Sequence, residues 1–207
     1  MDAEMVCKGF LLISQKISAQ KDYLTMLDQQ AGDGDLGISM ERGFRAVEDT
    51  LSQGECEDIG QLFLKVSRTL NETSPSSLGT ILSILFMGTA KALRGQAEVS
   101  INQLGLALER GMQSVMEKTG SNTGEKTVLD ALSPAIAALV QSDGKKALAN
   151  AALAAQQGAE ATREMLPVHG RAAYFAEKGI GKIDGGAEVC RLAFEALAEG
   201  FPQHKEE

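Results

Sequence analysis

Apolar residues recur at every third or fourth position along most of this chain, and no convincing run alternates at every second position. The three-to-four spacing places side chains on one face of a helix, whereas alternation would indicate strands. The pattern predicts eight helical elements, the first of them followed by a short helix that leads into an acidic loop. The predicted ranges are 2–20 with 22–29, then 38–52, 59–70, 78–87, 101–115, 128–139, 145–165 and 186–199.

The composition favours helices packed against one another in one unit. Of the 207 residues, 43% are apolar but only 4% are aromatic, and there is no Trp. Strands favour aromatic and β-branched residues, whereas the many alanines of this chain allow helices to approach closely. Because no shift in composition marks a linker, we expect a single all-α domain that spans residues 1–207.

The charge and the cysteines exclude several classes of protein. A formal net charge of −8 leaves no basic stripe for nucleic acid or for an anionic membrane. No apolar run approaches the roughly 18 to 20 residues of a membrane span, and the acidic N-terminus is unlike a signal peptide. Cys7, Cys56 and Cys190 lack metal or redox spacing, so we expect reduced thiols in a cytoplasmic protein.

Three carboxylates fall within eight residues of the predicted acidic loop: Asp28, Asp33 and Asp35. Residues two apart in an extended chain point the same way, roughly 6 to 7 Å apart, and the intervening glycines let Asp28 turn back toward the other two. Such a group repels itself unless a cation joins it. Oxygen ligands alone favour a hard ion such as Mg²⁺ or Ca²⁺.

This loop has two other possible interpretations. Asp-Gly pairs are ordinary turn formers, so a plain surface turn stays open as an alternative to a metal site. An EF-hand is excluded, because the position that needs its glycine holds Ile38 and the position that needs its bidentate glutamate holds Phe44. The helix predicted after the loop adds free N–H groups and a positive end beside the carboxylates. A cation site next to an anion site indicates a nucleotide.

Two further loops carry residues that are unusual for simple connections. In the segment 71–80, Ser74 suits a helix N-cap and Pro75 the first helical position, so the hydroxyls and N–H groups there could hold phosphate oxygens. An ordinary capped helix start is the alternative. The long segment 167–186 is typical of a lid or binding loop, and its Arg171 could clamp a phosphate or carboxylate, or be a plain surface arginine.

The segment 120–127, Gly-Ser-Asn-Thr-Gly-Glu-Lys-Thr, superficially suggests a P-loop. Glu125 separates the glycine from the lysine, and no buried strand precedes the segment, so the phosphate-cradling geometry is missing. A polar turn ahead of a helix is the better interpretation.

Taken together, these segments resemble the nucleotide-binding L subunit of dihydroxyacetone kinase, in order and over nearly the whole chain. The resemblance rests on L-D-x-x-x-G-D-G-D-x-G-x-x-M-x-R-G at 27–43 and G-E-K-T-x-L-D-A-L at 124–132. It also rests on G-R-A-A-Y at 170–174 and G-x-x-D-x-G-A at 181–187. The resemblance implies a barrel of eight antiparallel helices that binds ADP or ATP and two Mg²⁺ ions in loops at one end.

Site residues are carried over position by position. Asp28, Asp33 and Asp35 match the metal ligands at the catalytic centre. The positions that match nucleotide contacts are Leu36, Gly37, Ile38, Ser39, Ser77, Leu78, Thr127, Val128, Arg171, Asp184, Gly185 and Gly186. Of these, Arg171 and the segment 184–186 match the loop that covers the nucleotide.

The chain departs from the family pattern at three of these places. Leu36 stands where the bacterial family usually has His, and Ser-Pro-Ser-Ser-Leu-Gly replaces a glycine-rich Gly-Gly-x-Ser-Gly loop. Gly185 stands where the family has Pro, which predicts a looser lid hinge. These departures indicate a diverged member, one that could serve another short ketose.

The resemblance implies a subunit that passes a phosphoryl group to a ketose held by a sugar-binding K-type partner subunit. A phosphohistidine carrier of the M type is a further expected partner, if it recharges bound ADP. The alternative is a non-catalytic nucleotide-binding module that regulates another protein; Leu36 and the altered serine loop favour that alternative.

Overall fold

The computed structural model describes residues 1–30, 32–53, 57–142, 144, 146–169, 173 and 179–201. Across that part of the chain the ordered secondary structure is helical, apart from a single bridge between Asp2 and Glu98. The helices are α1 (Ala3–Ala19), α2 (Lys21–Asp28), α3 (Leu36–Ser52), α4 (Ile59–Thr73), α5 (Ser77–Ala92), α6 (Ile101–Thr119), α7 (Leu129–Gln141), α8 (Ala147–Ala161) and α10 (Gly185–Gly200), with a 3₁₀ turn η1 (Thr162–Glu164) after α8. No helix of these ranges is both long and apolar enough to cross a bilayer.

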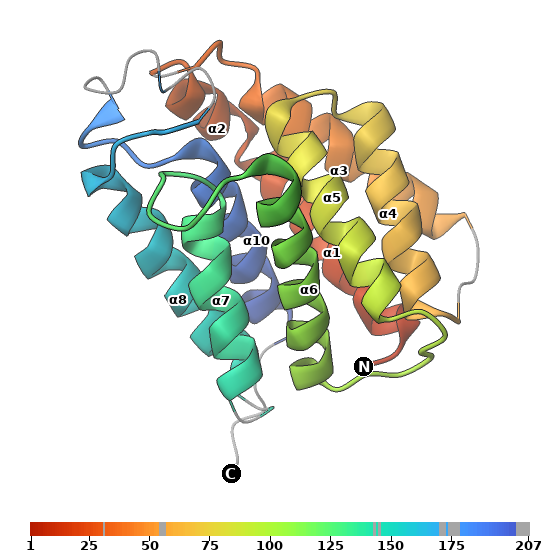
Figure 1. Cartoon of the computed structure of the whole chain (residues 1–207). Helices are drawn as coiled ribbons and strands as arrows, with labels where there is room; N and C mark the ends of the chain where they lie inside the picture. Colours follow the sequence, from red (N-terminus) through yellow and green to blue (C-terminus); the bar gives the residue numbers. More distant parts are fainter. Residues whose placement is uncertain are drawn as a thin grey trace.

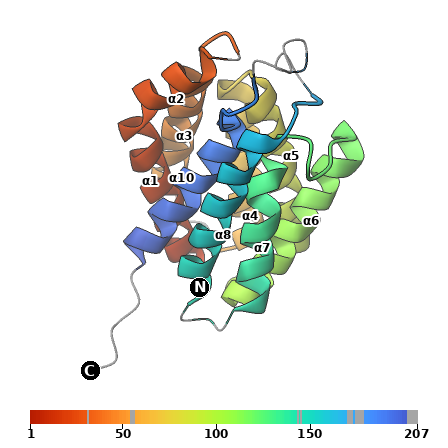
Figure 2. The same cartoon turned by 90° about the vertical axis from the view of Figure 1, so that its left-hand side faces the viewer.

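In the described ranges, eight long helices form a closed ring. Each packs against the next long helix along the chain, from α1 and α3 through α8 to α10, and α10 packs back against α1 (Figures 1 and 2). The short α2 follows α1 and packs against α3 and α10. The predicted all-α barrel of eight helices is therefore confirmed, with α2 as the short extension of the first helix.

The ring runs up and down, so consecutive long helices point in opposite directions (Figure 1). This topology places the N-termini of α3, α5, α7 and α10 at one end of the barrel, beside the loop that follows α2. Each helix start carries backbone N–H groups without intrahelical partners and the positive end of a helix dipole. Four such ends therefore lie at the end of the barrel that carries the acidic loop.

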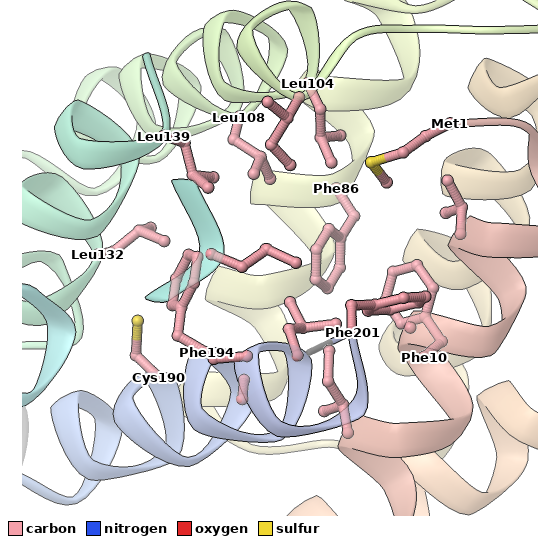
Figure 3. Close-up of a pocket in the computed structure, with 18 of the residues that line it drawn as sticks. Met1, Phe10, Phe86, Leu104, Leu108, Leu132, Leu139, Cys190, Phe194 and Phe201 are labelled. Carbon is pink, nitrogen blue, oxygen red and sulfur yellow. The ribbon is translucent and has the colours of Figure 1, made fainter. Parts of the chain in front are cut away.

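The barrel interior is apolar and contains a cavity of about 810 Å³. Figure 3 shows Leu132, Leu139, Cys190 and Phe194 on the walls of this cavity, with Met1 and Phe201 also among its lining residues. Three phenylalanine rings from α1, α4 and α5, those of Phe10, Phe63 and Phe86, pack with centroids 5.5 to 5.8 Å apart. This wall offers almost no polar groups, so a phosphate site must lie elsewhere.

Small residues set the closest approach in the ring. A Cβ built on Gly88 of α5 would lie 2.7 Å from the Cα of Gly111 on α6. Real Cβ atoms are not found so close to backbone atoms. The two glycines therefore allow α5 and α6 to touch through their backbones.

The predicted N-cap of α5 was wrong. Ser74 does not begin α5; its backbone N–H donates to the carbonyl of Leu70 at 2.9 Å and closes α4. The N-cap of α5 is Ser76, whose hydroxyl accepts from the backbone N–H of Gly79 at 3.1 Å. Pro75 lies between the two helices. The loop therefore ends α4 at Ser74 and begins α5 at Ser76, with a different serine for each function.

Candidate functional site

The three loop carboxylates meet at the end of the barrel. Asp28 is the last residue of α2 and Asp35 directly precedes α3, with Asp33 between them. One oxygen from each carboxylate lies within 4.8 Å of the others. Asp28 is half-buried, whereas Asp33 and Asp35 are exposed. The sequence-based expectation that these residues come together is therefore met in space.

Asp28 also builds the loop that carries the other two. Its Oδ2 accepts from the backbone N–H groups of Gly34 at 2.8 Å and Asp35 at 3.1 Å. Gly34 has a φ of 78°, a left-handed conformation that favours glycine. The turn that brings Asp33 and Asp35 back toward α2 thus depends on the Asp28 carboxylate and on Gly34.

The geometry fits a hard divalent ion. Mg²⁺ binds oxygens at about 2.0 to 2.1 Å, so two oxygens on opposite sides of one ion lie about 4 Å apart. Carboxylate oxygens within 4.8 Å of one another need only a small closure to share an ion. An all-carboxylate ligand set is also the chemistry that Mg²⁺ and Ca²⁺ prefer. Asp28, Asp33 and Asp35 are therefore the candidate metal ligands of this chain.

The first turn of α3 faces both α2 and α5. Leu36 and Gly37 are buried, Ile38 is 53% exposed, and Ser39 is buried. The Ser39 hydroxyl lies 2.9 Å from the Ser74 hydroxyl and donates to the Ser76 hydroxyl at 2.8 Å. The Ser39 hydroxyl is therefore already used to link α3 to the start of α5, so Ser39 can offer a phosphate mainly its backbone.

The start of α5 presents a different pair of residues. Ser77 is exposed at the first helical position, and Leu78 is buried in the core. An exposed hydroxyl beside unpaired N–H groups is suited to an anion. Of the two predicted contacts in this segment, Ser77 can offer a side chain and Leu78 only its backbone.

The loop between α6 and α7 is tied together by Asp130, a residue that the sequence analysis did not single out. Its carboxylate accepts from the backbone N–H groups of Gly124 and of Thr127, the latter at 2.7 Å. Thr127 is half-buried, whereas Val128 is 3% exposed and lines the barrel cavity. The predicted nucleotide contacts here reduce to Thr127 and to the backbone of Val128.

The segment 184–186 begins a helix. Asp184 is the N-cap of α10, and its carboxylate accepts from the backbone N–H of Ala187 at 2.8 Å. Gly185 and Gly186 form the first turn. The interpretation of Gly185 as a loose lid hinge was therefore wrong, because the cap and the helix fix its backbone. Removal of water raises the pKa of the Asp184 carboxyl to about 6, an effect opposed by the Ala187 N–H and by Lys126.

The start of α10 contacts two other predicted segments. A Cβ on Gly185 would lie 2.6 Å from Cδ2 of Leu36, and a Cβ on Gly186 would lie 3.2 Å from Cβ of Val128. The first turns of α3, α7 and α10 thus meet, and Ser39 joins the start of α5 to them. Segments spread over about 150 residues of sequence form one continuous end surface.

Arg171, the predicted clamp, lies outside the described residues. Nearby, His169 pairs with Glu125 at 2.5 Å between Nε2 and Oε2, so the segment after η1 reaches the loop between α6 and α7. The Asn122 N–H and His169 hold the pKa of Glu125 below its usual value.

Comparison with known proteins places these features in a family. The DAK2 domain matches residues 30–199. The ADP-binding subunit DhaL of PEP-dependent dihydroxyacetone kinase 1 from Listeria innocua is 29% identical over 185 residues, which is 89% of this chain and 90% of that protein. Its Escherichia coli counterpart is 30% identical over 186 residues, which cover 87% of this chain and 89% of that protein.

A solved structure shares the fold. The crystal structure of the dihydroxyacetone kinase from C. freundii, in complex with AMP-PNP and Mg²⁺, superposes with a TM-score of 0.78 at 28% identity. The alignment covers 96% of this chain and 34% of that one, so the chain spans about a third of that kinase. With a family match across most of its length and the same barrel, this chain belongs to the DAK2 domain family.

Proposed function

We propose that this chain binds ADP or ATP with Mg²⁺ and serves as the nucleotide-binding subunit of a kinase for dihydroxyacetone or a related short ketose. One observation carries the proposal. The Asp28, Asp33 and Asp35 oxygens gather at the barrel end where four helix N-termini converge. The names of the DhaL relatives, and the AMP-PNP and Mg²⁺ in the complex of the C. freundii kinase, support a nucleotide with Mg²⁺ as the ligand.

The residues divide the work by chemistry. The carboxylates would hold Mg²⁺, two ions on the family resemblance, and Mg²⁺ supplies charge neutralisation on phosphate oxygens. The first turns of α3 and α5 would donate backbone N–H groups to the phosphates, with the Ser77 hydroxyl beside them. Thr127 and the start of α10 would border the rest of the nucleotide. Phosphoryl transfer needs mainly such positioning and charge stabilisation.

The ketose would come from a partner. The chain spans nearly the whole of the DhaL subunits but only about a third of the C. freundii kinase. We therefore propose a sugar-binding K-type subunit as partner, with a phosphohistidine carrier of the M type if bound ADP is recharged in place. The barrel cavity is too apolar to hold a sugar on its own.

Calorimetric titration with ADP and ATP, with and without Mg²⁺, tests the binding step. We expect heat only when Mg²⁺ is present, and none for an Asp33→Ala variant. Absence of heat and of a thermal shift with the wild-type protein would defeat the proposal.

Turnover separates the kinase from a regulatory nucleotide-binding module. The purified chain is mixed with a K-type subunit, a C3 or C4 ketose and either ATP or a phosphohistidine carrier with its phosphate source. Formation of the ketose phosphate is expected. Tight nucleotide binding without any phosphorylated ketose would favour the regulatory module.

A further inference from the structure

Lys126 has an unusual backbone and an unusual burial. It is the one non-glycine residue in the described part of the chain with a positive φ, at 60°, and only 7% of it is exposed. A left-handed conformation costs a side-chain-bearing residue about 1 kcal/mol or more. The conformation directs the lysine side chain inward, toward the junction between η1 and α10.

The buried ammonium joins two distant pieces of backbone. Lys126 Nζ donates to the carbonyl of Thr162 and to the carbonyl of Lys182, the latter at 2.6 Å. These carbonyls lie just before and just after the segment 163–181. An ammonium removed from water needs such partners, and burial lowers the pKa of Lys126.

The two ends of that segment are also tied to each other. The Gly181 N–H donates to the Arg163 carbonyl at 2.8 Å, and the Arg163 guanidinium donates to the Gly181 carbonyl at 2.8 Å. The Asp184 N–H donates to the Thr162 hydroxyl at 2.9 Å. Lys126 therefore lies at the junction where η1 meets residues 181–184 and where Asp184 caps α10.

We infer that Lys126 is a positioning residue for the nucleotide site: its buried ammonium holds the junction between η1 and residues 181–184, and thereby holds the N-terminus of α10 against the first turns of α3 and α7. This inference rests on the proposed function, because the end surface so positioned is the one proposed to bind the nucleotide. Lys126 itself need not touch the nucleotide.

The charges around Asp184 make its pKa a measure of the electrostatic role of Lys126. A lysine that only filled space would not affect that pKa. Lys126 from the loop between α6 and α7 and Asp130 from the first turn of α7 face the Asp184 carboxyl, and Arg163 faces Lys126 from η1. Lys126 lowers the pKa of Asp184, whereas Asp130 raises it. Removing the ammonium while keeping the side-chain volume should therefore move the titration of Asp184 to higher pH.

The test compares Lys126→Met with the wild type by calorimetry with Mg-ADP from pH 5 to pH 8. Lys91→Met, which removes an exposed charge in the last turn of α5, is the matched control. We expect the wild type and Lys91→Met to lose affinity as the pH falls through about 6, where Asp184 protonates. Lys126→Met should bind about tenfold more weakly at pH 7, with its pH midpoint shifted upward, and should release nucleotide faster.

Hydrogen exchange without nucleotide gives an independent arm. Amides at the start of α10 should exchange faster in Lys126→Met, while amides in α4 and α5 stay unchanged. Lys126→Gln, which is neutral but can still donate, replaces Lys126→Met if that variant does not fold, with the same upward shift expected.

The outcomes are distinct. Unchanged affinity, pH midpoint and exchange in the lysine variants would overturn this inference alone. Absence of Mg-nucleotide binding by the wild type would defeat the proposed function and, with it, the role of Lys126 in binding.

Discussion

The Leu36 side chain packs directly against the backbone of Gly185: a Cβ built on Gly185 would lie 2.6 Å from Cδ2 of Leu36. The two residues are 149 positions apart and start different helices, α3 and α10. The family resemblance predicts a departure from the family pattern at both positions. The contact indicates that the two residues form one packing arrangement, in which a leucine fills the space beside a residue without a side chain.

The contact predicts that the effect of Gly185→Ala on stability changes sign when Leu36 is removed. Gly185→Ala should destabilise the fold by up to about 1 kcal/mol, because the leucine must move. In a Leu36→Ala background the same change should stabilise by about 0.4 to 1 kcal/mol, because it restricts the unfolded chain at the start of a helix. Urea unfolding of the four proteins measures the coupling. Additive effects, with no change of sign, would show that the contact carries no energy.

Proline at position 185 is expected to follow the same rule. Gly185 is the first residue of α10, a position that suits proline because its N–H has no intrahelical acceptor. Gly185→Pro should therefore be tolerated in the Leu36→Ala background and be costly beside Leu36. Thermal unfolding checks this when each Gly185→Pro variant is compared with its own parent protein. Equal shifts in melting temperature in the two backgrounds would contradict it.

The acidic residues should separate stability from binding. Asp33→Ala should abolish Mg-nucleotide binding and change the stability of the metal-free protein by less than about 0.5 kcal/mol, because Asp33 is exposed. Asp28→Ala should also abolish binding but cost about 1 to 2 kcal/mol, because two backbone N–H groups lose their acceptor. Urea unfolding and calorimetry test the pair. Equal stability of the two variants would contradict the scaffolding role of Asp28.

The start of α5 offers a matched pair of serines. Ser76→Ala should cost about 1 kcal/mol, because it removes the N-cap and a partner of the buried Ser39 hydroxyl. Ser77→Ala should change stability by less than about 0.5 kcal/mol and weaken Mg-ADP binding. Loss of stability in Ser77→Ala, or unchanged affinity, would mean that this hydroxyl is structural.

Asp184 predicts a pH dependence of stability. Its pKa in the folded protein, about 6, is above the ordinary value of 3.8, so the folded state holds this proton more tightly than the unfolded state does. Its contribution to stability is therefore fully present below the ordinary value and is lost as the pH rises through about 6. Relative to Asp184→Asn, the free energy of unfolding of the wild type should fall by up to about 1.4 kcal/mol per pH unit between pH 3.8 and about 6. Parallel stability curves for the two proteins would contradict this.

Local pattern was enough to predict the helices and the carboxylate cluster. One-faced apolar spacing depends only on helix geometry, and the predicted ranges agree with the structure to within a few residues at most ends. The convergence of Asp28, Asp33 and Asp35 could also be predicted, because glycines and short spacing keep all three within one loop. These features depend on residues close together in sequence.

Caps and helix starts were less predictable. Ser74 and Ser76 are chemically equal candidates to cap α5, and only the tertiary packing, which buries Ser74 at the end of α4, decides between them. Gly185 reads as a hinge in the sequence because glycine is permissive, yet Asp184 and Leu36 enclose it at a helix start. Neighbours distant in sequence decided both cases.

The sequence alone determined the set of helices, the cluster of three carboxylates in one loop and the match to the family. Only the closed ring decided that four helix starts share one end, that Val128 faces the cavity, and that Lys126 reaches the carbonyls of Thr162 and Lys182. The reason is physical: helix periodicity and turn chemistry are local, whereas burial and hydrogen-bond partners depend on which distant segments the packing of the barrel brings together.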